Sequence, residues 1–63
     1  MNAYKIVCRT RGMADRVLTK AGDATNVGYG QPVLYSASMA VKALRYWMSR
    51  ANCSHIVFSI EAV

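Results

Sequence analysis

Residues 38–63 read SMAVKALRYWMSRANCSHIVFSIEAV, and the spacing of the apolar residues changes once within this stretch. Over residues 38–51 they recur every three or four positions, which is the repeat of one face of an α-helix. Over residues 56–62 they alternate, which is the repeat of a half-buried strand. The stretch therefore predicts the main amphipathic helix at 38–51 and a strand at 56–62.

The two faces of the predicted helix differ in chemistry. Ser36 or Ser38 can cap its first turn by accepting a hydrogen bond from a backbone N–H, and Asn52 can end it in the left-handed conformation. The stripe that should pack on a sheet consists of Ala40, Val41, Leu44, Trp47, Met48 and Ala51. The opposite face carries Lys42, Arg45, Tyr46, Ser49 and Arg50.

Two further strands are expected before the helix. Residues 4–9, YKIVCR, alternate so that Tyr4, Ile6 and Cys8 share one face. Residues 32–37, PVLYSA, are rich in β-forming side chains, and Pro32 fits the start or edge of a strand because it cannot donate a ladder hydrogen bond. The sheet face away from the helix should then expose Lys5, Val7, Arg9, His55, Val57 and Ser59.

The segment between these strands allows two interpretations. Its apolar residues have helical spacing, so residues 12–21 predict a short extra helix with Thr10 as its cap. Residues 15–20, DRVLTK, could instead form a strand paired in a hairpin with residues 4–9. We favour the helix. Residues 22–31, GDATNVGYGQ, hold three of the four glycines and predict a loop.

Together these elements predict an α+β fold in one domain spanning residues 1–63. The expected architecture is a two-layer sandwich, in which a small, mainly antiparallel sheet of three strands packs on the helix at 38–51. Hydrophobic residues make up 54% of the chain, which is enough for a core and argues against disorder. A chain this short buries only about 60% of its unfolded surface, so a homodimer formed through a sheet edge could add stability.

The net charge and the expected cellular compartment limit the classes of partner that this chain could bind. Lys plus Arg is 8 and Asp plus Glu is 3, a net charge of +5 that favours nucleic acid or an acidic protein surface. No apolar run follows MNAYK, and no stretch approaches the roughly 20 apolar residues that cross a bilayer. We therefore expect a cytoplasmic protein without a membrane partner, in which Cys8 and Cys53 are reduced and at least partly buried.

The residues that carry catalysis or bind metals are scarce. Cys53 and His55 could share one strand face, but no third group is evident to orient the histidine. Together with Cys8 they lack the paired spacing of a zinc site. The glycines at 28 and 30 do not have the spacing of a phosphate-binding loop. The sequence therefore predicts no enzyme, no cofactor and no metal site.

Two basic sets are the candidate binding residues. The first, on the outer face of the helix, is Lys42, Arg45, Tyr46 and Arg50. Tyr and Arg are enriched in protein interfaces, and an exposed Tyr46 among cations fits one, although a solvated helix face would look alike. The second set, on the open sheet face and the turn beyond it, is Lys5, Arg9 and Arg11. Either set would also attract phosphates without sequence selectivity.

This layout of a small basic sheet with one helix resembles phage-encoded inhibitors of host machinery, namely the T7-like inhibitor of bacterial RNA polymerase and type I anti-CRISPR proteins. The opening MNAYKI and the ending NCSHIVFSIE are similar to the ends of one type I-F anti-CRISPR family, whereas residues 9–31 have no counterpart. The resemblance implies steric blocking of a host protein or ribonucleoprotein complex, in the host cytoplasm. The alternative is a module that binds DNA or RNA directly.

Overall fold

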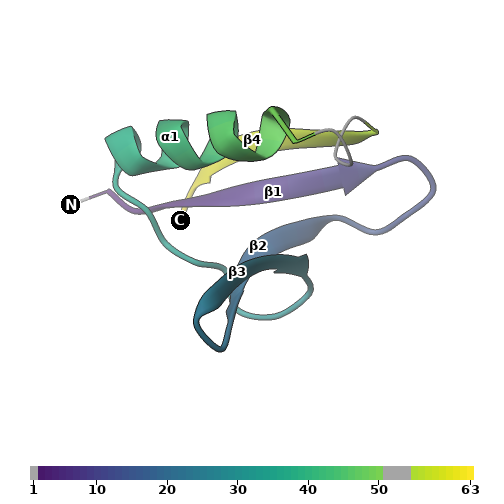
Figure 1. The fold of residues 1–63 in the computed structure, drawn as a ribbon, viewed down its shortest axis with the longest axis horizontal. Coiled ribbons are helices and arrows are strands. Elements are labelled where there is room, and N and C mark those ends of the chain that lie inside the picture. Colours follow the sequence, from purple (N-terminus) through teal and green to yellow (C-terminus); the bar gives the residue numbers. More distant parts are fainter. Residues whose placement is uncertain (1, 51–54) are drawn as a thin grey trace.

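The computed structural model describes residues 2–50 and 55–63 and contains one helix and one sheet. The elements are β1 (Tyr4–Thr10), β2 (Arg16–Ala21), β3 (Ala24–Gly28), α1 (Ala37–Met48) and β4 (Ile56–Ala62). The strands form one antiparallel sheet in the order β3-β2-β1-β4. The helix lies along β1 and β4, while β2 and β3 curl away from it as a hairpin (Figure 1). The α+β class is confirmed, but the sheet has four strands instead of three.

The β2–β3 hairpin replaces the short helix predicted at 12–21 and the loop predicted at 22–31. In the β2–β3 register Leu18 pairs with Val27, and the side chain of Leu18 is fully buried. Gly22, at a φ of 61°, lies in the two-residue turn, where the left-handed conformation suits the twist of a hairpin. The favoured helix was wrong, because adjacent apolar residues in β2 also fit a helical repeat. The alternative, a strand at 15–20 paired with residues 4–9, is confirmed, since β2 pairs antiparallel with β1.

The segment predicted as a strand at 32–37 is not one. It forms two isolated bridges, of Pro32 with Thr19 on β2 and of Tyr35 with Tyr4 on β1. β1 and β2 pair at only two positions before they separate, and the segment runs across the opening between them. It is extended, as its composition predicted, but its two bridges lie on two different strands.

The helix begins at Ala37, behind Ser36, whose Oγ accepts a hydrogen bond from the Met39 backbone N–H at 3.4 Å. The predicted cap at Ser36 is therefore confirmed. Ser49 forms the C-cap, whereas Asn52, which was expected to end the helix, lies outside the described residues.

The apolar stripe of the helix is turned toward the hairpin relative to the prediction. Ala40 is fully buried, and the side chains packed beside it on the core are Ala43, Leu44 and Trp47. Val41 and Met48 were expected in the stripe but are 41% and 62% exposed. The predicted burial of these two residues was wrong, because the small Ala40 and Ala43 lie on the side of the helix that packs on the sheet. Ala51 lies outside the described residues.

Candidate binding surface

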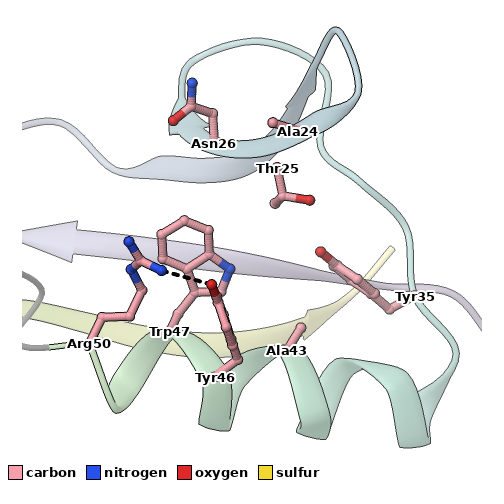
Figure 2. Close-up of a pocket in the computed structure, with 8 residues that line it drawn as sticks. All are labelled: Ala24, Thr25, Asn26, Tyr35, Ala43, Tyr46, Trp47 and Arg50. Carbon is pink, nitrogen blue, oxygen red and sulfur yellow. Dashed lines mark hydrogen bonds between the residues drawn. The ribbon is translucent and has the colours of Figure 1, made fainter.

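A groove of about 630 Å³ separates the second half of α1 from the β2–β3 hairpin. It exists because α1 lies along β1 and β4, while the hairpin curls away from the helix (Figures 1 and 2). Its lining residues are Ala24, Thr25, Asn26, Tyr35, Ala43, Tyr46, Trp47 and Arg50. Three of these are aromatic and one is cationic, so the groove suits a flat or negatively charged group.

Arg50 lies at one end of this groove and is held by aromatic side chains. Its Nη1 donates a hydrogen bond to the Tyr46 Oη at 2.7 Å, as Figure 2 shows. The guanidinium carbon lies 5.5 Å from the centroid of the Tyr46 ring and 5.4 Å from that of the Trp47 ring. These distances are within the range of cation–π attraction. The contacts orient Arg50 without neutralising its charge.

Trp47 connects the groove to the core. Its ring lies edge-on to the Tyr46 ring with centroids 5.8 Å apart, and tilted against the buried Phe58 ring at 6.4 Å. Trp47 was expected in the core rather than as a binding platform; it packs on the core and also lines the groove. The contributions of Thr25 and Asn26 were missed, because both residues lie on β3, in the segment predicted as a loop. Tyr35 lines the groove from the extended segment that bridges to β1.

The first predicted set lies on two adjoining surfaces of α1 and of the turn after it. The helix was predicted to continue to residue 51 but ends at Met48, so Arg50 follows the C-cap. Tyr46 and Arg50 border the groove, whereas Lys42 and Arg45 are exposed and absent from its lining. From the helix start to Arg50 the chain has these three cations and no carboxylate. We call these four residues the helix site. Their positive charge faces solvent and lacks a local counter-charge on the helix.

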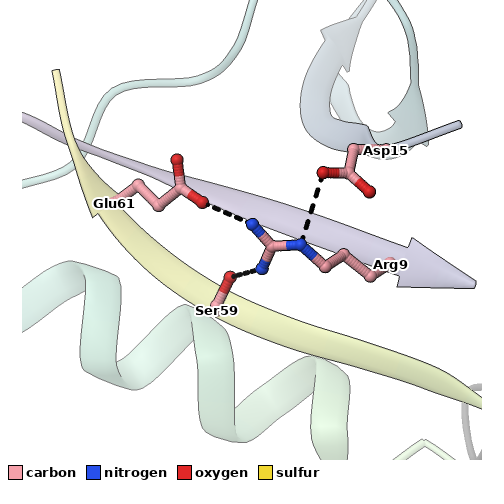
Figure 3. A network of polar contacts seen from close by, with 4 residues as sticks. All are labelled: Arg9, Asp15, Ser59 and Glu61. Atoms are coloured by element: carbon pink, nitrogen blue, oxygen red, sulfur yellow. Dashed lines mark hydrogen bonds and ion pairs between the residues drawn. The ribbon is translucent and has the colours of Figure 1, made fainter.

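The second predicted set has a different electrostatic environment, which centres on Arg9 (Figure 3). Its guanidinium donates hydrogen bonds to the Ser59 Oγ at 2.7 Å and the Glu61 Oε2 at 2.8 Å. Its Nε lies 3.3 Å from the Asp15 Oδ2. The hydrogen bond to Glu61, and then the charge of Asp15, raise the pKa of Arg9 above its ordinary value. Arg9 thus remains cationic and is paired within the chain.

This pairing makes the open sheet face less cationic than the sequence suggested. Arg9 contacts two of the three carboxylates that the chain has. Lys5 is opposite Glu61 in the β1–β4 register, and Arg11 is exposed in the turn after β1. Lys5, Arg9 and Arg11 therefore do not form a joint surface of unpaired positive charge.

Val7 lies beneath Arg9, and its predicted exposure was wrong. It is 4% exposed although it is on the sheet face away from the helix. Val7 is opposite Ser59, so the Arg9 side chain must run back over Val7 to reach Ser59 and Glu61. The methylene stem of an arginine covers apolar surface in this way while its charged end stays in water.

We predict that Arg9→Ala destabilises the protein more than Arg9→Met does. Methionine lacks the charge but can still cover Val7, whereas alanine exposes it. Urea denaturation of both variants beside the parent checks the order. Equal losses for the two variants would mean that the ion pairs alone matter and that the cover over Val7 does not.

Catalytic or metal chemistry gains no support from the described residues. Across residues 2–50 and 55–63, no three His, Cys, Asp or Glu side chains gather where they could hold a metal ion. Cys8 is buried, as predicted, and His55 is exposed; Cys53, considered as its partner, lies outside the described residues. Within the described residues, no helix has the length and hydrophobicity needed to span a bilayer.

Comparison with protein-family models, with curated proteins and with solved structures finds no match to this chain.

Proposed function

We propose that this is a non-enzymatic binding protein that inhibits a larger bacterial complex by covering one of its functional surfaces. The observation that carries this proposal is the helix site beside the groove. Lys42 and Arg45 are exposed on α1, Arg50 is exposed directly after the C-cap, and Tyr46 is 57% exposed among them. No acidic residue occurs between Ala37 and Arg50.

The helix site combines two means of recognition. Its cations attract an acidic surface and accelerate encounter with it. The adjoining groove can then admit a side chain of the partner between Trp47 and the hairpin, where Arg50 is already oriented by Tyr46. Aromatic and arginine side chains next to a pocket are the residues that most often dominate binding energy.

The target class follows from the resemblance to phage-encoded inhibitors. Such proteins block host complexes sterically, so we propose a host protein or ribonucleoprotein complex with an acidic or nucleic-acid-binding surface, reached in the host cytoplasm. The compact two-layer fold supports this mode of action, since a rigid surface can exclude another ligand without chemistry of its own.

A second candidate function is direct binding of single-stranded DNA or RNA. The specific observation in its favour is that Tyr35, Tyr46 and Trp47 line the same groove as Arg50. Bases stack on aromatic rings in many such sites, while phosphates pair with nearby cations.

Two measurements separate these functions. If the target is a protein surface, immobilised protein should retain a complex from bacterial lysate, and nuclease treatment should not release it. Binding to a bare mixed-sequence oligonucleotide should then be negligible at physiological salt. A nucleic-acid binder using Lys42, Arg45 and Arg50 would bind that oligonucleotide with a slope of about −2 in log K against log salt. That slope in a gel-shift titration would overturn the protein-directed proposal.

A further inference from the structure

The free edge of β4 carries a second surface, independent of the proposed function. β4 is the outermost strand next to β1, and its seven residues pair with β1 without interruption. Natural sheets protect exposed edges with Lys, Pro or a bulge. β4, with the sequence IVFSIEA, has neither Lys nor Pro, and its register with β1 shows no bulge. The charged side chain on β4, that of Glu61, is paired with Arg9 of β1.

The hydrogen-bonding groups on this edge can be assigned from the register. The Val63 N–H donates to the Ala3 carbonyl at 2.9 Å, so Val63 faces β1. Orientation alternates along an antiparallel strand, so residues 57, 59 and 61 also face β1. The N–H and C=O groups of residues 56, 58, 60 and 62 point away from it, toward the free edge.

An exposed apolar flank of the helix lies above the same edge. Val41 and Met48 are seven residues apart and therefore project from the same side of α1. The groove-lining Ala43, Tyr46 and Arg50 face the hairpin. Because Ala40 at the buried face separates the two flanks, Val41 and Met48 overhang the β4 side.

The midpoint of the β4 edge and the midpoint of the helix flank lie at the same level along the strand. One two-fold axis can therefore pair both of them with the same elements of a second copy. Trp47 packs on Phe58, and α1 runs opposite to β4, because its first residues lie beside Tyr4, which pairs with Ala62. With rises of about 1.5 Å per helical residue and 3.3 Å per strand residue, Ser59 is level with about residue 45. The midpoint between residues 41 and 48 lies at almost the same level.

We infer that a second copy of this chain pairs with the β4 edge around a two-fold axis through Ser59. In that register residues 56, 58, 60 and 62 of one copy meet residues 62, 60, 58 and 56 of the other, and each pair can exchange two hydrogen bonds. The same axis brings Val41 of one copy against Met48 of the other. A foreign strand would satisfy the backbone edge but would leave this apolar flank uncovered. The dimer has one continuous sheet, with both helix sites on the same side.

Sedimentation velocity over a range of concentrations tests this dimer. The parent protein should sediment as twice the 6.9 kDa chain and dissociate on dilution. Val41→Glu with Met48→Glu should raise the dissociation constant of the dimer at least about tenfold, because carboxylates would be buried against apolar groups. Leu34→Glu with Met39→Glu is the matched control, since both positions are about half exposed and lie away from β4; it should leave the constant unchanged.

Amide hydrogen exchange keeps the test decisive if the glutamate variant does not fold. In the parent, exchange of the Phe58 and Ile60 amides should slow as concentration rises. The amides of Val57 and Ser59, which face β1, should not change. A parent that stays monomeric at all concentrations would overturn the inference. So would a dimer in which the Phe58 and Ile60 amides exchange equally fast at low and high concentration.

Discussion

Replacing Leu18 with alanine should remove about 3 kcal/mol from the free energy of unfolding. The Leu18 side chain is fully buried and belongs to one core cluster with Ile6, Cys8 and Phe58. Truncating a buried leucine costs roughly 2–5 kcal/mol, depending on the cavity that remains. A domain of this size has a total stability of only about 3–9 kcal/mol, so the loss should be about a third of that stability or more.

Leu34→Ala provides a matched control for this prediction, since Leu34 is 54% exposed and undergoes the same chemical change. It should alter stability by less than about 0.5 kcal/mol, as exposed substitutions usually do. Urea denaturation followed by circular dichroism measures both variants. Similar small losses for Leu18→Ala and Leu34→Ala would mean that the β2–β3 hairpin is not part of the core.

The largest effect on binding is expected when Tyr46 and Arg50 are both replaced with alanine. Their side chains hold each other through a 2.7 Å hydrogen bond and border the groove, so the pair should act as the centre of the interface. Interface residues of this kind cost about 2 kcal/mol or more each when truncated. We expect at least a thirtyfold loss of affinity for the captured complex, which corresponds to about 2 kcal/mol.

The double variant Tyr29→Ala with Arg11→Ala is its compositional match. Tyr29 is 67% exposed in the loop after β3, and Arg11 is exposed in the turn after β1, so both variants lose one tyrosine and one cation. Surface plasmon resonance against the captured complex should give the control near-parental affinity, and thermal melts should be similar for both. Equal losses of affinity in the two variants would mean that binding depends on net charge and not on the helix site.

The helix and strands β1 and β4 could be predicted because each buries one regular face. Tyr4–Thr10 and Ile56–Ala62 alternate, and Ser36 caps a helix whose apolar spacing is clear. The exposure of Tyr46, Lys42 and Arg45 on α1 followed from the same spacing. These features depend on residues that are close together in the chain, so they could be predicted from the amino-acid sequence alone.

The features that were missed depend on tertiary packing. β3 is mostly exposed, and its sequence ATNVG has no hydrophobic repeat. It becomes a strand by pairing with β2. The groove lies between two elements of which only one was predicted. Val7 is buried on the sheet face where Arg9 folds back toward Glu61. The alternating pattern of a strand does not indicate which carboxylate an arginine side chain will contact.

Hydroxyl-radical footprinting of the captured complex tests most directly whether the helix site is the contact surface. The method reports side-chain exposure at aromatic and sulfur-containing residues. Tyr46 and Trp47 report on the helix site and its groove, and Tyr29 and Met13 report on a surface away from them. If binding occurs at the helix site, oxidation of Tyr46 and Trp47 should fall in the complex, while oxidation of Tyr29 and Met13 stays at the level of the isolated protein. Protection of Tyr29 and Met13 with unchanged Tyr46 and Trp47 would contradict the account.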